Sequence, residues 1–505
     1  MLATVPSAVV FGVDGRSVSV EVHVSRGLPS FTVVGLPDAS CREARDRVRA
    51  ALLSCRFTWP DSRITVNLAP SELRKQGSGL DLPIALGVLV ASGQVKERIL
   101  AGVGAVGEVG LDGSVRPVAG IVPLVDALPA DWVVVPAACG AEAELVRPGR
   151  VRPVADIRTL VARLEGSQPW PAVPPPVEQD ALPPAPDLAE VRGQPLARLA
   201  LELAAAGGHH LLMVGPPGSG KSMLASRLVG LLPELSTEEA LLVTRIHSAA
   251  GLRIPTEGVV RRPPFRAPHH GTSAVALVGG GTAALRPGEI SAAHGGVLFL
   301  DELGEFAPAV LDSLRVPLEE GLIRVSRAAQ SATLPARFLL VAAMNPCPCG
   351  EGGPAGSCRC PSAARARYAR RLSGPLLDRF DLRLDVQPPD PSVLLDQDPG
   401  EPSAAVAGRV AAVRRLARER GVSCNAELSA PALEELAPLD AEARDLLEGA
   451  LRAGRLTGRG LRRVRTVART ILDLRQDGAS RVDLEAISMA LTLRGSMADV
   501  IGADR

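Results

Sequence analysis

The sequence predicts an α/β protein in three parts: an N-terminal α/β domain, a second α/β domain with a phosphate-binding loop, and an all-helical C-terminal domain. The loop reads G-P-P-G-S-G-K-S at residues 215–222, between an apolar run and a helix-forming stretch. A proline-rich stretch at residues 165–186 separates two halves of unlike pattern. From about residue 393, strand signals give way to charged, alanine- and leucine-rich helical periodicity. A chain of 505 residues is also too long for one hydrophobic core, and suggests about three domains.

The N-terminal α/β domain is expected over residues 1–164. Apolar or alternating runs predict strands at residues 17–24, 64–68 and 132–136. Helical patterns cover residues 40–54 and 81–92. Residues 165–186 follow as an extended linker, because dense proline is incompatible with the interiors of helices and sheets.

The phosphate loop opens the second α/β domain, expected over residues 187–392. A buried strand at 210–214 and a helix at 223–232 would flank it, which is the context that this motif requires. Its backbone N–H groups can hold phosphates, Lys221 can reach the β and γ phosphates, and the Ser222 hydroxyl can bind Mg²⁺. The predicted ATP-binding residues are Gly215, Pro216, Pro217, Gly218, Ser219, Gly220, Lys221 and Ser222. Lysine occurs elsewhere only at Lys75 and Lys96, so its use at position 221 indicates a specific requirement for lysine. The alternative interpretation of the whole loop is a chance glycine-rich turn.

A second motif, G-V-L-F-L-D-E at residues 296–302, is an apolar strand that ends in two carboxylates. ATP hydrolysis needs Mg²⁺ opposite the loop and a group that orients the attacking water. Asp301 is therefore expected to face the metal ion and Glu302 the water. Buried strands end in Asp-Glu by chance as well, but a complete phosphate loop upstream favours the functional interpretation.

Two further polar residues follow apolar or turn segments of the same domain. The predicted strand at residues 338–344 ends at Asn345, where a central strand would meet the γ phosphate. Arg379 lies in a turn flanked by acidic residues. Arg379 either forms a surface ion pair of little energetic value or is an arginine finger for the γ phosphate of a neighbouring subunit.

Four of the eight cysteines are clustered in a glycine-rich insert at residues 347–360. Two C-x-C pairs can supply four thiolates to one structural Zn²⁺; the alternative is reduced free thiols. The candidate ligands are Cys347, Cys349, Cys358 and Cys360. The scattered cysteines are interpreted as small buried hydrophobic residues: Cys41, Cys55, Cys139 and Cys424.

Several strings together resemble the AAA+ ATPases of the magnesium-chelatase-like branch, most closely the bacterial ComM/YifB proteins, over nearly the whole chain. These are R-P-P-F-R-A-P-H-H at 262–270, P-G-E-I-S at 287–291, the motif at 296–302, and L-S-G-P-L-L-D-R-F-D-L at 372–382. The resemblance implies that Asn345 is sensor 1, that Arg379 is the arginine finger, and that Arg459 is the sensor 2 arginine of a helical lid. The lid would span residues 393–505.

The same resemblance places two segments near the channel of a ring. Residues 265–281 match a helix 2 insert, and residues 321–337 match the hairpin before sensor 1. Arg324 and Arg327 on this hairpin are candidate phosphate contacts with DNA; a charged edge strand in solvent is the alternative. Neighbours on a regular element point apart, so His269 and His270 are expected to be pore or loop residues, not metal ligands.

Residues 1–164 resemble the fold of the Lon proteolytic domain, through V-N-L-A-P at 66–70, K-Q-G-S-G-L-D-L-P at 75–83 and G-E-V-G at 107–110. The serine and lysine of the Lon dyad fall on Gly79 and Val122, so we predict no protease activity. DNA contact, ring assembly or partner docking are the expected uses of this domain. Lys75 is expected to mark its working surface.

The leading hypothesis is a ring-forming, hexameric ATPase that is stimulated by DNA, such as a branch-migration helicase in recombination or natural transformation. A ring follows from Arg379, which has no γ phosphate to serve within its own subunit. The alternatives are a chelatase-type motor subunit for metal insertion into a tetrapyrrole, and an ATP-dependent chaperone or protease regulator. The net charge of +1 permits DNA binding without indicating it, and 2% aromatic residues argue against a base-stacking surface. With no long apolar run, we expect a cytoplasmic protein without membrane contact.

Overall fold

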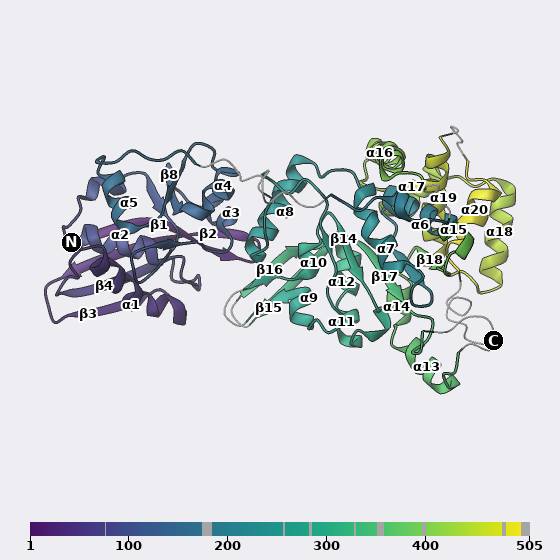
Figure 1. The fold of residues 1–505 in the computed structure, drawn as a ribbon, viewed down its shortest axis with the longest axis horizontal. Helices are drawn as coiled ribbons and strands as arrows, with labels where there is room; N and C mark the ends of the chain where they lie inside the picture. The colour runs from purple at the N-terminus through teal and green to yellow at the C-terminus, as the bar shows by residue number, and fades with distance from the viewer. Residues whose placement is uncertain are drawn as a thin grey trace.

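Three regions follow one another along the longest axis of the molecule (Figure 1). The computed structural model describes residues 1–75, 77–173, 184–255, 258–281, 285–327, 330–350, 358–395, 400–476 and 481–495. The N-terminal α/β region lies at one end, the helical C-terminal region at the other, and an α/β core with a parallel sheet between them (Figure 1). The predicted fold class is confirmed.

A four-stranded sheet forms the first half of the N-terminal region. The strand order is β1-β2-β4-β3; β3 pairs in parallel with β4 and the other pairs are antiparallel. Every residue of the helix α2 is buried, which explains its continuous apolar sequence. The elements are β1 (Leu2–Phe11), β2 (Asp14–Ser25), β3 (Ser30–Val34), β4 (Arg63–Ala69), α1 (Ala39–Ser54) and α2 (Asp81–Ala91).

The second half of this region is a three-stranded parallel sheet of order β5-β8-β9. Its elements are β5 (Val103–Ala105), β6 (Glu108–Val109), β7 (Val115–Arg116), α3 (Ile121–Asp126), β8 (Trp132–Pro136), α4 (Gly140–Glu144), β9 (Val151–Val154) and α5 (Ile157–Leu164). Trp170, in the expected linker, still packs on this region, with the guanidinium groups of Arg163 and Arg152 5.8 and 5.9 Å from its ring centroid. Residues 174–183 of the linker lie outside the described residues.

The core is built on a five-stranded sheet of order β11-β14-β17-β10-β18, and all of its strand pairs are parallel. The strands β10, β14 and β17 are buried along their whole length. Because parallel strands share a direction, their carboxyl ends meet at one edge of the sheet. The strands are β10 (Leu211–Val214), β11 (Phe265–Arg266), β14 (Val297–Leu300), β17 (Leu339–Met344) and β18 (Leu382–Asp385).

The described helices of the core range in length from four residues in α10 to fourteen in α8. The helix after the phosphate loop, predicted to reach residue 232, ends at Arg227 and continues as a 3₁₀ turn over Leu228–Leu231. The helices are α6 (Pro195–Gly207), α7 (Lys221–Arg227), α8 (Thr237–Ala250), α10 (Glu289–Ala292), α11 (Pro308–Asp312), α12 (Arg315–Glu320), α13 (Ser362–Arg370) and α14 (Gly374–Leu377).

The insert and the hairpin expected near a channel are both formed. The insert contains α9 (Ala274–Val278) and pairs β12 (Gly279–Gly280) with β13 (Arg286–Pro287). The hairpin pairs β15 (Leu322–Arg327) with β16 (Gln330–Pro335) in antiparallel register, with Ile323 opposite Leu334.

The C-terminal region is helical, as predicted. Its helices α16 and α19 pack against α6 of the core, and their apolar residues belong to the same cluster as those of β10 and β18. The helices are α15 (Pro391–Leu395), α16 (Ser403–Glu419), α17 (Ala430–Leu436), α18 (Ala441–Arg452), α19 (Gly458–Arg475) and α20 (Leu484–Thr492). None of the helices in the described ranges has the length and apolar character needed to span a bilayer.

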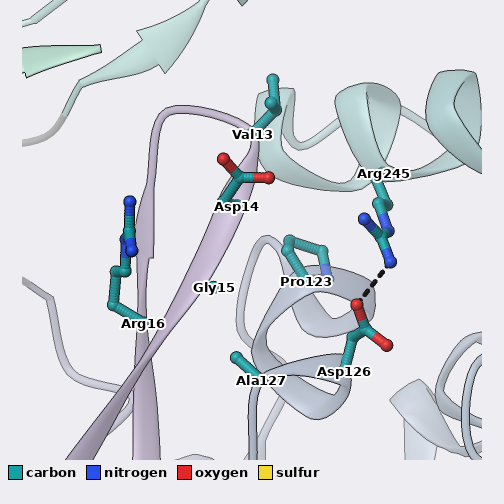
Figure 2. A pocket seen from close by; sticks show the side chains of 8 residues that line it. All are labelled: Val13, Asp14, Gly15, Arg16, Pro123, Asp126, Ala127 and Arg245. Carbon is teal, nitrogen blue, oxygen red and sulfur yellow. Dashed lines mark hydrogen bonds and ion pairs between the residues drawn. The ribbon is translucent and has the colours of Figure 1, made fainter. Parts of the chain in front are cut away.

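The N-terminal region packs against the core through helix α3 and through the β1–β2 turn, among other contacts of the described residues. Helix α3 contacts α8, where the backbone N–H of Gly120 donates to the Ser248 carbonyl (2.9 Å) and that of Val122 to the Ser248 hydroxyl (3.2 Å). The Arg245 guanidinium of α8 also forms an ion pair with Asp126 of α3, beside a pocket under the β1–β2 turn (Figure 2). At this turn, Val13 is buried in the apolar cluster that contains Ile323 and Leu334 of the hairpin.

Candidate nucleotide-binding site

The phosphate loop connects β10 to α7 at the edge where the strands end. Gly218 and Gly220 have φ angles of +77° and +88°, which glycine adopts without strain. A Cβ atom at Gly218 would meet no atom within 4 Å, so the loop faces open space there. A Cβ atom at Gly215 would lie 2.0 Å from the Val386 carbonyl oxygen, so the close approach of the chain after β18 requires this glycine.

Lys221 lies beneath the loop. Its ammonium group donates to the carbonyl oxygens of Gly215 and Pro216, both at 2.8 Å, and lies 3.4 Å from the Asn345 side-chain oxygen. Burial lowers the pKa of Lys221, although the Asp301 carboxylate opposes this shift. The ammonium is thus held beside the loop, at the end of β17, by weak acceptors that a bound phosphate can replace.

Ser222 and Asp301 face each other across the same edge. The Ser222 hydroxyl donates to a carboxylate oxygen of Asp301 at 2.7 Å. A hydroxyl and a carboxylate are oxygen ligands of the kind that Mg²⁺ prefers. The donor set therefore fits a Mg²⁺ ion bound together with a nucleotide.

Glu302 has a left-handed backbone conformation, with φ of +51°, which is uncommon for a residue with a side chain. Its carboxylate lies 3.0 Å from Nδ1 of His270 in the insert. The ring centroids of His269 and His270 lie 3.9 Å apart, in a loop segment. The segment is a turn here, and the alternation of a regular element does not apply.

Two residues near the site, Gln194 and Glu319, are not predicted as functional residues by any motif in the sequence. The Gln194 side chain donates to the Ser219 carbonyl in the phosphate loop at 2.8 Å and to the Gln387 carbonyl at 3.2 Å. Its left-handed φ of +54°, just before Pro195, is not visible in a local pattern. Glu319 forms an ion pair with Arg379.

Arg379 is buried against its own subunit. Its guanidinium bonds to Glu319 and donates to the Pro375 carbonyl at 2.9 Å. The side chain is therefore not presented at the surface of the single chain. Any contact with a neighbouring subunit requires that it leave Glu319.

Among the arginines at the start of α19, it is Arg463 that contacts the core. Arg463 forms an ion pair with the buried Asp381 and donates to the Arg379 carbonyl at 2.8 Å. Arg459, the residue expected from the motif, is exposed in the first turn of the helix, which Thr457 caps. Sequence spacing cannot separate these two arginines, because both lie on the first turns of one helix.

The other candidates fall into three groups. Arg324 is exposed on β15 and pairs with Glu320 at 2.8 Å, while the side chain of Arg327 lies outside the described residues. The four clustered cysteines lie together. Lys75 is fully buried and donates to the Pro70 carbonyl, so the expectation that it marks a working surface is wrong.

Comparisons with known proteins cover nearly the whole chain. Residues 187–394 match the family model described as magnesium chelatase, subunit ChlI; residues 20–138 match subunit ChlI of Mg-chelatase; residues 400–494 match its C-terminal part. The chain is 45% identical to Mycobacterium tuberculosis protein Rv2897c, covering 97% of each chain. It is 44% identical to Escherichia coli YifB and 43% identical to Haemophilus influenzae competence protein ComM, covering 94% of each chain in both cases.

The chain belongs to the YifB/ComM family of magnesium-chelatase-like proteins. As a YifB/ComM protein it carries an AAA+ domain, a class of ATPase domain, in the part that holds the phosphate loop. Two partial similarities lie outside this family. The chain is 27% identical to a probable DNA helicase, MCM9, of Arabidopsis thaliana, over 43% of this chain and 27% of that protein. It is 30% identical to the magnesium-chelatase 67 kDa subunit of Heliobacterium mobile, over 39% of this chain and 32% of that protein.

Proposed function

We propose that this YifB/ComM protein is an ATP-hydrolysing, ring-forming motor that acts on DNA, as a branch-migration helicase in recombination or natural transformation. The observation that carries the ATPase part is the convergence of Lys221, Ser222, Asp301 and Asn345 at one edge of the parallel sheet. A cation, an oxygen pair for Mg²⁺ and an amide at the ends of adjacent strands are what phosphoryl transfer to water requires.

Within this proposal, each residue has a defined role. The backbone of residues 215–220 and Lys221 hold the phosphates, and Ser222 and Asp301 hold the Mg²⁺ that accompanies ATP. Glu302 orients the attacking water, and Asn345 contacts the γ phosphate. The bound Mg²⁺ supplies charge neutralisation at the transferred phosphoryl group.

The ring rests on arginines that serve a site made by two subunits. Arg379 reaches the γ phosphate of the neighbouring subunit after leaving Glu319, and Arg459 contacts nucleotide from the lid. In a hexamer, the hairpin with Arg324 and Arg327 and the insert with His269 and His270 line the channel and contact DNA phosphates.

The DNA part of the proposal rests on relatives. The similarity to the competence protein extends over 94% of this chain, whereas the similarity to the chelatase subunit extends over 39%. The relative named as a probable DNA helicase also covers 43% of this chain. Competence involves uptake of DNA, so DNA is the substrate we favour, and the cytoplasm is the proposed location.

The decisive experiment is the ATPase rate of the purified protein without nucleic acid and with single-stranded, duplex and four-way-junction DNA. Glu302→Gln is the blank, because it keeps the size of the side chain and removes the carboxylate. Stimulation that is largest with the junction supports the proposal. A flat response to every DNA contradicts it; stimulation by a chelatase partner or by casein instead would identify a tetrapyrrole or polypeptide substrate.

A further inference from the structure

Four cysteine side chains meet directly after the strand that ends at Asn345. The Sγ atom of Cys347 lies 3.2 Å from that of Cys349 and 3.5 Å from that of Cys358, and the last two lie 3.7 Å apart. All four Sγ atoms, including that of Cys360, lie within 4.8 Å of one another. None of them forms a disulfide.

These separations fit one tetrahedral metal ion. With Zn–S bonds of about 2.3 Å, the sulfur atoms of a tetrahedral site lie about 3.8 Å apart. Thiolates are soft ligands that select Zn²⁺ over Mg²⁺, and binding requires that each thiol lose its proton. Four sulfur ligands leave no open position, so the ion would be structural.

We propose that Cys347, Cys349, Cys358 and Cys360 bind a structural Zn²⁺ ion that fastens the segment after Asn345 to the phosphate loop and to the turn after Glu302. The contact with the phosphate loop runs through Gly350, whose backbone N–H donates to the Cys347 carbonyl at 3.0 Å. A Cβ atom at Gly350 would lie 2.8 Å from the Pro217 ring and 3.9 Å from the Asn345 amide nitrogen. The backbone of the cysteine segment thus packs on the loop.

The contact with the turn after Glu302 runs through α13, which begins two residues after Cys360. Tyr368 of this helix is buried, and a Cβ atom at Gly304 would lie 2.5 Å from its ring. Arg371 donates to the Gly304 carbonyl at 2.8 Å and pairs with Glu305 at 3.0 Å. One ion therefore joins the two ends of a loop. The first end packs on the phosphate loop at Pro217, and the second leads into α13, which packs on the turn at Gly304.

Closing this loop with a metal ion removes conformational freedom from both of its ends. Loss of the ion is expected to leave the sheet folded, because β17 is buried along its whole length. It is expected to loosen Asn345, Pro217 and the turn at Gly304. The metal site does not depend on the proposed DNA motor, whereas its effect on turnover rests on the proposed ATPase.

The first test is the metal content of the full-length protein purified without chelator, measured by mass spectrometry of the elements. One zinc ion per chain is expected for a site with four thiolates. The Cys349→Ser variant should lose the zinc, and the matched control Cys55→Ser should keep it. Cobalt substitution should give the thiolate charge-transfer and visible bands of a tetrahedral sulfur site. Zinc-free protein with eight reactive thiols, or iron with inorganic sulfide, would overturn the proposal.

The second test measures the fastening without relying on catalysis. Zinc is removed from the wild-type protein with a chelator under reducing conditions, and hydrogen exchange of residues 215–222 and 300–306 is followed with and without restored zinc. Faster exchange in both segments, reversed by zinc, is expected, together with weaker binding of a fluorescent ATP analogue. Unchanged exchange after complete zinc loss would overturn the fastening, whatever the ATPase rate with DNA turns out to be.

Discussion

At the scale of single residues, the pair of Glu302 and His270 is the most informative contact of the site. Glu302 is the group proposed to orient the attacking water, yet its carboxylate lies 3.0 Å from a histidine that belongs to the insert. Its left-handed backbone costs of the order of 1 kcal/mol, which surrounding contacts must offset. The contact with His270 thus joins the Glu302 carboxylate to the insert.

Replacing His270 by alanine is expected to raise the ATPase rate in the absence of DNA. The substitution removes the contact that holds Glu302, so the carboxylate is freer to reach water without a signal from the insert. Stimulation by DNA should shrink accordingly, measured as the ratio of rates with and without a four-way junction. His269→Ala is the matched control, because no ion pair joins His269 to Glu302 among the described residues. A rate reduced equally with and without DNA would instead make His270 a residue that positions Glu302 for catalysis.

Arg379→Ala is expected to lower kcat by about a thousandfold or more, which is the usual contribution of an arginine finger. Binding of a fluorescent ATP analogue should be unchanged, because an arginine finger stabilises the charge that develops in the transition state and not the bound ATP. Glu319→Ala is the control, since it frees Arg379 without removing it. In mixtures with the wild-type protein, the variant should lower the rate per wild-type subunit. A rate that simply follows the wild-type fraction would contradict a shared site.

At this scale the sequence predicts the motif residues well and their partners poorly. Lys221, Ser222, Asp301 and Asn345 lie at the ends of the strands, where short motifs in the sequence predict them, and their roles stay predictions. The contacts of Gln194 and Arg463 join residues far apart in the chain, and no local pattern encodes them. Lys75 shows the opposite failure: a rare, charged residue suggested a surface role, but it is buried with a backbone carbonyl as its partner.

At the scale of elements, α19 connects the C-terminal helices to the core through buried polar groups. The ring of His209, which precedes β10, lies 2.8 Å from the Thr470 hydroxyl of α19. Burial opposes the charged form of Asp381, but the Arg463 guanidinium of α19 lowers the pKa of this carboxyl overall. Thr470 and Asp381 are both buried, so these contacts of the histidine and the aspartate exist in the folded state only.

Acidification is expected to destabilise this junction. Burial lowers the pKa of His209 to about 4, and also that of His294 before β14, whereas both would titrate near 6.5 in the unfolded chain. Between these values the unfolded state binds more protons, so the stability contributed by the neutral rings is complete above pH 6.5 and falls as the pH approaches 4.

The measurement is the Tm between pH 7 and pH 4.5 at constant ionic strength. His209→Gln should lower the slope of Tm against pH in the acidic range, because a glutamine does not titrate. His23→Gln is the control, since His23 is exposed. An equal slope in His209→Gln and the wild-type protein would show that His209 does not carry the pH dependence.

The sequence predicts the elements more accurately than their arrangement. The strand expected at residues 132–136 is β8, and the helix expected at 81–92 is α2 to within one residue, because their apolar runs are continuous. The order β11-β14-β17-β10-β18 depends on pairing between strands far apart in the chain, which periodicity does not contain. The 3₁₀ turn that ends the helix after the phosphate loop was missed because its leucines also fit a helical pattern.

At the scale of the whole molecule, the N-terminal region is attached to the parts of the core that are proposed to face DNA. Val13 belongs to the same apolar cluster as Ile323 and Leu334 of the hairpin, and α3 packs on α8, the helix that precedes the insert in the chain. Movement of the hairpin would therefore disturb its apolar packing against the β1–β2 turn of the N-terminal region. We expect the position of the N-terminal region to follow the state of the hairpin.

Val13→Asp is expected to separate the two regions at this contact. The substitution places an unpaired carboxylate in an apolar cluster and forfeits about 2 kcal/mol of apolar burial besides. Faster hydrogen exchange of β15 and β16 and a lower Tm are expected, with weaker stimulation of the ATPase by DNA. Leu28→Asp is the control, because Leu28 is 83% exposed in the same region. Unchanged exchange in the hairpin would show that the contact is absent in solution.

The buried position of Val13 also has a consequence for biosynthesis. On the ribosome, residues 1–164 emerge and can fold long before residues 322–335 of the hairpin exist, so the β1–β2 turn waits without its apolar partners. Val13 and the backbone donors of Gly120 and Val122 stay uncovered during that interval. A nascent chain that stalls after the N-terminal region therefore exposes an apolar surface with free backbone donors. Chaperones or a second nascent chain can bind this surface before the rest of the protein is synthesised.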